Sequence, residues 1–388
     1  MAERSLIFPT GEFQKRTDEL QRQMDRHGID ALLLTTAPDI FYVTGFLTRF
    51  WESPARPWYV VVPAKGALTA VIPSIGLDLM RRTWVDDIRT WQAPNPDESG
   101  VAQLADAICD CVPEAGQIGV PMGLETQIRM PLADFFELER VIAPRQIVDA
   151  TACVQRVRER KSEDEIARVR HVCGIAALAF DQVSSFAAPG VGLDHVFAEF
   201  QVACLRAGAD WVSYVAGAAG QGGYGDVISP AAARPLEQGD ILMLDTGAVC
   251  EGYFCDFDRN FSMGQPYDDA TRAHDALWQA TEDVLGAMMP GQRASDVHQM
   301  LCDALIRRGA KPGAGRLGHG LGLSLTEWPS ISAVDDTVLV ENMVLTLEPS
   351  AVIAAGKMMV HEEVIVLRAD GAELLSPRAP AALPVIGQ

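Results

Sequence analysis

The segment ILMLDTGAVCEGYFCDFDRNF, residues Ile241 to Phe261, contains two strand-like apolar runs that each carry an aspartate. Asp245 ends the first run, and Asp256 lies in the second. A buried carboxylate is so costly to desolvate that it is normally protonated, paired with a cation or bound to a metal. Arg259 is the only basic residue in the segment, so the segment alone does not identify a partner for both carboxylates.

The overall composition is typical of a globular protein with two domains, since 48% of the 388 residues are hydrophobic and 22% are charged. The net charge of -20 argues against a nucleic-acid partner, whose phosphates would be repelled. The cysteines include no CxxC pair, which favours reduced thiols over a disulfide or zinc framework. The sequence also shows no signal-like start and no membrane-length apolar run. We therefore expect a cytoplasmic protein that binds neither nucleic acid nor a membrane.

The first part of the chain alternates helix-like and strand-like segments. RTDELQRQMDRHGI and VAQLADAICDCV are amphipathic, whereas DALLLTT and PWYVVVPA are typical of strands. This pattern predicts an α/β domain over residues 1–150. A second domain, residues 151–388, is then expected to begin near Thr151. Within it, Ser162 and Glu165 form a capping box that predicts the start of a long helix.

An internal repeat organises the second domain. PGVGLDHVFAEFQVACLRAGA, residues 189–209, aligns without gaps on PGQRASDVHQMLCDALIRRGA, residues 290–310. Downstream, GDILMLDTGA corresponds to ENMVLTLEPSA, which matches Asp245 with Glu348, and the following strand-like run of each half supplies Asp256 or Glu362. The repeat therefore predicts two similar halves that each offer two carboxylates to one centre.

Strand periodicity supports this convergence, because side chains in a strand alternate between its two faces. Each of the four acids can then point to the common centre, while His361 and Glu363 have the opposite parity to Glu362 and are expected on the other face. Four carboxylates cannot share a site without cations. His319, flanked by glycines in RLGHGLGLSLTEWP, is a fifth candidate ligand, and glycines let the backbone approach closely.

A set of carboxylates with one imidazole suits divalent manganese, cobalt, iron or zinc, and bridging carboxylates suit two such ions. Two metals about 3.5–4 Å apart can hold a hydroxide nucleophile and polarise a scissile carbonyl.

The motifs LMLDTGA, GYFCDFDR, GHGLGL, VLTLEPS and VHEEVIVL, in that order, resemble those of the pita-bread metallopeptidase superfamily, which contains methionine aminopeptidases, aminopeptidase P, prolidase and creatinase. The similarity extends over residues 161–380. GIDALLLTTAPDIFYVTGF, residues 28–46, resembles the N-terminal domain of the creatinase and prolidase branch. The resemblance implies a creatinase-like α/β domain followed by an α+β pita-bread domain with a pseudo-two-fold repeat.

The same resemblance implies a set of site residues and a reaction. The metal ligands would be Asp245, Asp256, His319, Glu348 and Glu362. Glu348 and His319 would be catalytic, with Glu348 as the proton shuttle. Asp258, on the same strand face as Asp256, stands where the family often has threonine, and we expect it to support the ligands as a hydrogen-bond acceptor. The implied cofactor is a pair of divalent ions, manganese before cobalt, iron or zinc. The implied activity is hydrolysis of a dipeptide or small amide of the Xaa-Pro type through a metal-bridging hydroxide.

Two departures from the peptidase pattern qualify that activity. Thr326 stands where these peptidases carry a second histidine, and DVISPAAA replaces a segment that usually supplies a histidine upstream of the first aspartate ligand. Both histidines normally contact the substrate or the tetrahedral intermediate, so Thr326 is a candidate substrate contact. A metal-dependent lyase similar to the dimethylsulfoniopropionate lyase of this superfamily therefore stays open. A metal-free binding module is a second alternative, although such relatives usually lose ligands and this chain keeps all five.

Two loops give further candidates. GQGGYG, residues 220–225, matches a dinucleotide-binding pattern, but no helix start follows it, so we expect an active-site or surface loop with Tyr224 as a possible substrate contact. GFLTRFWESPARPWY, residues 45–59, is either a loop that packs within its own domain or, by the resemblance, one whose Arg49 and Trp51 reach the pocket of a neighbouring subunit. The second alternative implies a homodimer.

Overall fold

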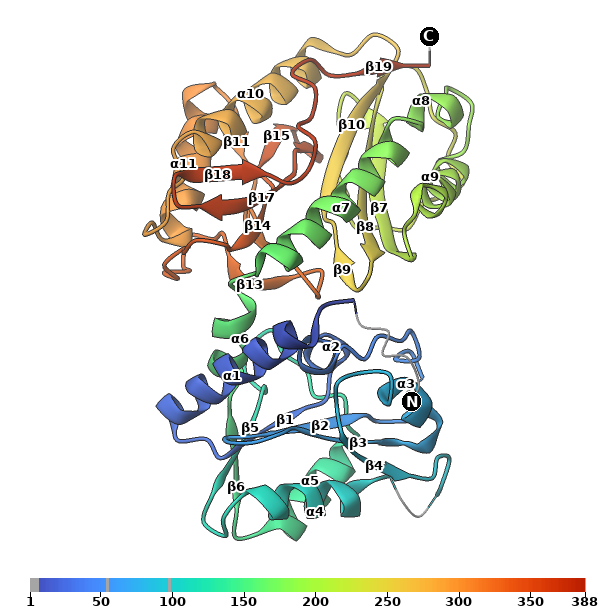
Figure 1. The fold of residues 1–388 in the computed structure, drawn as a ribbon. Helices are drawn as coiled ribbons and strands as arrows, with labels where there is room; N and C mark the ends of the chain where they lie inside the picture. The colour runs from blue at the N-terminus through green and yellow to red at the C-terminus, as the bar shows by residue number, and fades with distance from the viewer. Residues whose placement is uncertain (1–6, 54–55, 97–98, 388) are drawn as a thin grey trace. The chain divides into compact units, whose positions relative to one another are not determined.

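The computed structural model describes residues 7–53, 56–96 and 99–387. The chain forms two compact units, Met1–Arg158 and Glu159–Gln388, each with its own strands and helices (Figure 1). The domain boundary predicted near Thr151 stays a prediction, because a division by contacts does not test whether each part folds alone. No helix in the described ranges is long and apolar enough to cross a membrane.

The N-terminal unit is built on a six-stranded sheet in the order β4-β3-β2-β1-β5-β6. β1 pairs with β2 antiparallel and with β5 parallel, so the sheet is mixed. Both β1 and β2 are buried along their whole length, which places them in the core. The strands are β1 Ala31–Leu34, β2 Tyr59–Pro63, β3 Thr69–Pro73, β4 Asp87–Trp91, β5 Gln117–Val120 and β6 Gln146–Asp149.

Helices cover both faces of this sheet, with α1 on one face and α4 and α5 on the other (Figure 1). Leu104 and Ile108 of α4 lie one turn apart and pack with Val61 and Val71 of the sheet in one apolar cluster. The expected α/β architecture is confirmed. The helices are α1 Thr10–His27, α2 Ala37–Thr44, α3 Leu77–Met80, α4 Val101–Cys111, α5 Leu132–Ile142 and α6 Thr151–Arg158, with a 3₁₀ turn η1 Ser74–Gly76.

The C-terminal unit begins with the helix that the capping box predicts. The Ser162 hydroxyl accepts a hydrogen bond from the Glu165 amide at 3.3 Å, and the Glu165 carboxylate accepts one from the Ser162 amide at 3.0 Å. These two bonds satisfy amides that the first helical turn leaves without partners. The helices of this unit are α7 Glu163–Phe180, α8 Val183–Phe186, α9 Leu193–Ala207, α10 Asp268–Leu285 and α11 Ala294–Arg307.

Three sheets complete the unit. One has the order β19-β10-β8-β7 with β9 paired to β8, another the order β13-β12-β14-β17-β18, and the third the order β11-β15-β16. The strands are β7 Trp211–Gln221, β8 Asp240–Cys250, β9 Tyr253–Phe254, β10 Phe257–Met263, β11 Lys311–Pro312, β12 His319–Gly320, β13 Glu327–Ser330, β14 Val344–Leu347, β15 Ser350–Ala354, β16 Lys357–Val360, β17 Glu363–Arg368, β18 Gly371–Leu374 and β19 Val385–Ile386.

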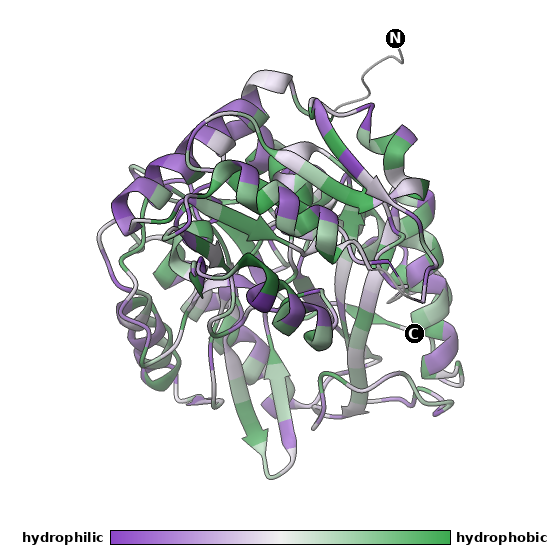
Figure 2. Cartoon of the chain, turned by 90° about the horizontal axis from the view of Figure 1, so that it is seen from below, coloured by the Kyte–Doolittle hydropathy of each residue, from purple (hydrophilic) through white to green (hydrophobic). Residues whose placement is uncertain are grey.

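The predicted repeat appears as two matching sets of elements. α9 and α11 fall within the two aligned segments, and each is followed by an antiparallel strand pair, β8 with β10 and β14 with β17. Apolar clusters from both strands and helices form the core. In Figure 2, helices carry hydrophilic and hydrophobic residues in turn, whereas many strands are hydrophobic over long stretches. The candidate ligands Asp256, Glu348 and Glu362 lie just outside strands, whereas Asp245 lies in the middle of β8 and does not end it as expected.

Candidate metal centre

Three buried side chains of the C-terminal unit are close enough together to hold one metal ion. The ligand atoms of Asp256, His319 and Glu362 all lie within 4.8 Å of one another. They come from three separate segments: the break between β9 and β10, the short strand β12, and the break between β16 and β17. Asp245 and Glu348, the other two predicted ligands, are not members of this group of three.

The prediction that Asp256 and Glu362 lie inside strands is wrong. Each lies in a two-residue break, between Phe254 and Phe257 in one half and between Val360 and Glu363 in the other. Strand pairing resumes directly after each break. A backbone outside a ladder is not bound to strict alternation, so the breaks let both carboxylates turn toward the same centre.

Tyr214 links Asp245 to the group of three. Its hydroxyl lies 3.2 Å from each carboxylate oxygen of Asp245 and also forms a short hydrogen bond with Asp256. The sequence pattern did not predict this tyrosine as part of the centre. The register of β7 on β8 shifts between Val212 and Val215, so Tyr214 lies in an irregular part of the strand whose side-chain direction periodicity does not predict.

His319 presents one ring nitrogen to the centre. Its Nδ1 donates to the carbonyl oxygen of Gly320 at 2.9 Å, and its Nε2 lies 3.2 Å from Asp256 Oδ2. A backbone acceptor on Nδ1 fixes the ring orientation and leaves Nε2 as the ligand atom. Burial by itself lowers the pKa of His319, but the hydrogen bond and charge of Asp256 raise this pKa above its ordinary value.

The carboxyl groups of the centre cannot all be ionised at once unless a cation is present. Burial, and then the neighbouring carboxylates, raise the pKa values of Asp245 and Glu362 well above the ordinary range. The pKa of Glu348 is also raised, chiefly by burial. Glu362 Oε1 is a buried oxygen with no hydrogen-bond partner among the described residues. A divalent cation fits this set, because it would neutralise the carboxylates and give the oxygen a partner.

Glu348, like Asp245, is only half-buried. Its side chain is 22% exposed, and its Oε1 lies 3.4 Å from Nε of Arg316. The backbone amide of Glu348 donates to the Leu317 carbonyl at 3.0 Å, which fixes this residue beside the segment that leads into His319. The sequence pattern did not single out Arg316 either, although it is the only arginine or lysine in RLGHGLGLSLTEWP.

Asp258 supports Glu362 through the backbone. Its Oδ1 accepts from the Glu362 amide at 2.7 Å, and its Oδ2 accepts from the Asn260 side chain at 3.1 Å. Burial raises the pKa of Asp258 to about 8. Tyr224 continues the same network: its hydroxyl donates to Asn260 at 2.9 Å and accepts from the Val360 amide at 2.7 Å. Tyr224 is buried, so these contacts give its predicted substrate role no support.

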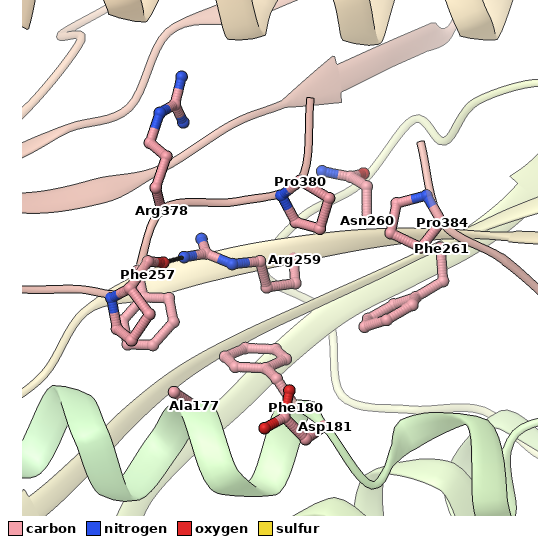
Figure 3. A pocket seen from close by; sticks show the side chains of 11 residues that line it. Ala177, Phe180, Asp181, Phe257, Arg259, Asn260, Phe261, Arg378, Pro380 and Pro384 are labelled. Carbon is pink, nitrogen blue, oxygen red and sulfur yellow. Dashed lines mark hydrogen bonds between the residues drawn. The ribbon is translucent and has the colours of Figure 1, made fainter. Parts of the chain in front are cut away.

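Arg259, the basic residue of the opening segment, faces away from the centre. Its guanidinium donates to the Glu362 carbonyl at 3.0 Å and to the Glu363 carboxylate at 3.1 Å. It lines a cavity of about 180 Å³, with Phe257 and Phe180 beside it (Figure 3). Glu363 thus lies on the other face from Glu362, as parity predicts. Arg259 therefore stabilises the backbone at Glu362 from the face opposite the group of three, and it is not the partner of the candidate ligand carboxylates.

His361 also belongs to the face opposite the centre. Its Nε2 lies 2.6 Å from a guanidinium nitrogen of Arg378, which in turn donates to Glu363 at 2.9 Å. Burial, and then the charge of Arg378, lower the pKa of His361 well below its ordinary value. His361 thus has its contacts away from the group of three, as expected, although strand alternation does not apply to it because residues 361 and 362 lie in the break.

The remaining predicted contacts are distributed over both units. Thr326 is half-buried, and its hydroxyl lies 3.4 Å from Nη2 of Arg316. In the N-terminal unit, Arg49 lies 3.4 Å from Glu52. Trp51 packs its ring 5.9 Å from that of Trp58, measured between centroids. Whether Arg49 and Trp51 reach a neighbouring subunit stays a prediction.

Comparison with protein-family models assigns both units. Residues 167–369 match the model of metallopeptidase family M24. Residues 16–160 match the creatinase/prolidase N-terminal domain. All five predicted ligands lie inside the first match.

Individual relatives extend over nearly the whole chain. A probable dipeptidase PepE of Mycobacterium tuberculosis is 27% identical over 361 residues, 89% of each chain. An Xaa-Pro dipeptidase of Pyrococcus horikoshii is 24% identical, over 91% of this chain and 94% of the relative. The crystal structure of dipeptidase PepE from Mycobacterium ulcerans superposes with a TM-score of 0.83 at 25% identity, over 98% of this chain and 99% of that one. The predicted two-domain fold is confirmed.

Proposed function

Because the chain belongs to metallopeptidase family M24, we propose that it hydrolyses a dipeptide or small amide of the Xaa-Pro type with the help of divalent metal ions. The observation that carries the proposal is the buried group of Asp256, His319 and Glu362, whose ligand atoms lie within 4.8 Å of one another. Similarity to dipeptidases and Xaa-Pro dipeptidases along most of the chain supports the substrate class.

We propose two metal ions, manganese before cobalt, iron or zinc, held by the group of three together with Asp245 and Glu348. The donor set suits these ions because it combines carboxylate oxygens with one imidazole nitrogen. When bound, the ions would activate a water molecule and polarise the scissile carbonyl.

The residues of the chain then have separate tasks. Tyr214 and Asp258 orient ligands, since one contacts two carboxylates and the other holds the Glu362 amide. Glu348 is the proposed proton shuttle. It is partly exposed, and burial raises the pKa of its carboxyl group, so this group takes up a proton more readily than an ordinary glutamate. His319 offers Nε2 in a fixed direction, because its Nδ1 is hydrogen-bonded to the Gly320 carbonyl.

A substrate panel on the manganese-loaded protein tests the proposal. The panel contains Ala-Pro, Ala-Ala, a small neutral amide and dimethylsulfoniopropionate, with Asp256→Ala as the metal-binding control. We expect manganese-dependent release of amino acid from at least one dipeptide in the wild type and none in the control. If dimethylsulfoniopropionate were the only member cleaved, the proposed reaction would be elimination and not hydrolysis. A loaded protein that cleaves no member of the panel would contradict the proposed function.

A homodimer and a cytoplasmic location belong to the proposal as sequence-based predictions. The dimer follows from the resemblance of the N-terminal part to a domain that packs across a two-fold axis in this branch. Light scattering should give twice the chain mass of 42.0 kDa. A monomer at micromolar concentration would contradict the dimer and, with it, the role of Arg49 and Trp51 at a neighbouring pocket.

A further inference from the structure

Arg316 is a weakly held guanidinium at the edge of the acidic centre. Its Nε lies 3.4 Å from Glu348 Oε1, and its side chain is 39% exposed. Its Nη2 lies 3.4 Å from the Thr326 hydroxyl. Both distances exceed the usual 2.7–3.2 Å of an N–H to oxygen hydrogen bond. Among the residues that the structure describes, Nη1 has no contact of this kind, so most of its N–H groups are available.

The backbone around Arg316 is well anchored. The Leu317 amide donates to Ile331 at 2.7 Å, and the Leu317 carbonyl accepts from the Glu348 amide at 3.0 Å. On the other side, the Gly315 carbonyl lies 3.3 Å from Nε2 of His298. These bonds fix the base of the Arg316 side chain next to Glu348. Its place at the centre is therefore set by the fold.

Stability alone does not account for this arginine. A surface ion pair contributes a median of only about 0–1 kcal/mol to stability. Arg259 provides the contrast within the same unit: its side chain is 9% exposed, and it binds a carbonyl at 3.0 Å and a carboxylate at 3.1 Å. Arg259 has the contacts of a structural arginine, and Arg316 does not.

We propose that Arg316, assisted by Thr326, binds a carboxylate group of the substrate beside Glu348, and so determines specificity. This inference rests on the proposed function of the site. A planar guanidinium can hold a carboxylate with two parallel N–H donors, which gives both charge and orientation. Once Glu348 shares its charge with a cation, its attraction for Arg316 weakens, and the guanidinium favours another anion. The Thr326 hydroxyl can donate to the same group.

The consequence is a narrower substrate class. A substrate with a free carboxylate next to the reacting bond should be preferred over the matching carboxamide. A neutral amide, or a peptide blocked at its carboxyl end, lacks the group that Arg316 would bind. An amino acid amide such as L-prolinamide carries a net positive charge on its amine, so the acidic side chains of the site would by themselves favour the amide over the free amino acid. A preference for the acid therefore requires a local cation.

The test compares the binding of L-proline and L-prolinamide to the manganese-loaded protein by isothermal titration calorimetry, which needs no turnover. We expect the wild type to bind L-proline at least about tenfold more tightly, as for a charge-assisted hydrogen bond. Arg316→Gln should reduce this ratio to about one, and Arg316→Lys should retain part of it, because a lysine keeps the charge but not the paired donors.

Arg307→Gln is the matched control, because Arg307 also lies 3.4 Å from a carboxylate, that of Asp283, and its side chain is 62% exposed. It should leave the ratio unchanged, and all variants should hold as much manganese as the wild type. A wild type without preference, a preference that survives Arg316→Gln, or no binding of either probe up to about 10 mM would overturn the inference. Acid preference without any dipeptide hydrolysis would refute the proposed function and leave the Arg316 assignment standing.

Discussion

The two repeated halves of the C-terminal unit bring their acids to the centre in different ways. In the first half, Asp245 and Asp256 share the hydroxyl of Tyr214, a neighbour from their own sheet. In the second half, Glu348 is 22% exposed and has a cation at 3.4 Å, while Glu362 keeps a buried oxygen without a partner. Each half thus has one half-buried acid, Asp245 or Glu348, but in the part of the chain that the structure describes only the acids of the first half share a hydrogen-bonding side chain.

This difference indicates that the two repeated halves have different roles at the centre. Side chains that are already hydrogen-bonded lose little freedom when a metal binds, so Tyr214 is suited to fixing the two acids of the first half. The group of three itself draws on both halves, because His319 and Glu362 belong to the second. A partly exposed acid can exchange protons with a substrate. Glu348 of the second half, which also has Arg316 beside it, is therefore suited to proton transfer. The following substitutions and conditions test this difference in role, from the largest expected effect to the smallest.

Asp256→Ala should have the largest effect, because Asp256 contacts both His319 and Tyr214. We expect the variant to fold and to lose at least about 100-fold in manganese affinity, more than loss of a supporting residue causes. Metal content after dialysis, measured by inductively coupled plasma mass spectrometry, checks this. Asp283→Ala, at a partly exposed acid of α10, is the control. If Asp256→Ala still held two ions tightly, the assignment of Asp256 as a ligand would be wrong.

Tyr214→Phe removes the hydroxyl that joins the acids of the first half and leaves the ring in place. Loss of such a supporting hydrogen bond typically weakens metal binding by about 10–100-fold, and we expect a value in that range. Manganese titration of the metal-free variant provides the measurement. If Arg316→Gln weakened manganese binding more than Tyr214→Phe did, the supporting role of Tyr214 in metal binding would be wrong.

Thr326→His restores the histidine that the peptidase pattern has in the second half. A well-aimed donor to a developing oxyanion contributes about 10²–10³ in rate, and threonine cannot carry a proton near neutral pH. Without further adjustment of the site, we expect roughly a tenfold higher kcat for Ala-Pro, from a slow wild-type rate, and a new titration near pH 6.5. Rapid Ala-Pro hydrolysis by the wild type would show that the histidine is dispensable.

The smallest effect concerns pH and stability. Burial and neighbouring carboxylates raise the pKa of Glu362 well above the ordinary range. The folded metal-free protein therefore holds a proton that the unfolded chain releases near pH 4.3. Its stability should fall as the pH rises from that value through the raised pKa. Bound metal should remove this loss, because metal binding requires the ionised carboxylate.

Thermal unfolding with and without manganese between about pH 5.5 and 8.5 measures this effect. The difference in Tm between the manganese-loaded and the metal-free protein should increase with pH. Each kcal/mol of added stability should raise Tm by about 2–4 °C. Glu362→Gln should reduce this increase more than Glu348→Gln, because Glu348 is partly exposed and its pKa is less strongly raised. A difference in Tm that decreases as the pH rises would contradict the assignment.

Local sequence was sufficient wherever the interaction itself is local. The start of α7 followed from Ser162 and Glu165, which bond to each other across one helical turn. Period-two alternation put Glu363 on the face opposite Glu362, and the structure pairs Glu363 with Arg259 at 3.1 Å. The same alternation failed for the position of Glu362 itself, because a two-residue break interrupts the strand there.

The residue types at the centre were therefore determined by the sequence: the repeat and the motifs identified an acid set with one histidine before any contact was known. Only the tertiary structure decided which side chains join that set. Tyr214 reaches Asp256 through an irregular strand register, and Arg316 meets Glu348 through a backbone bond between distant segments. Such contacts depend on how far one strand shifts against another and on which charges are buried together. Neither quantity is encoded in the spacing of residues along the chain.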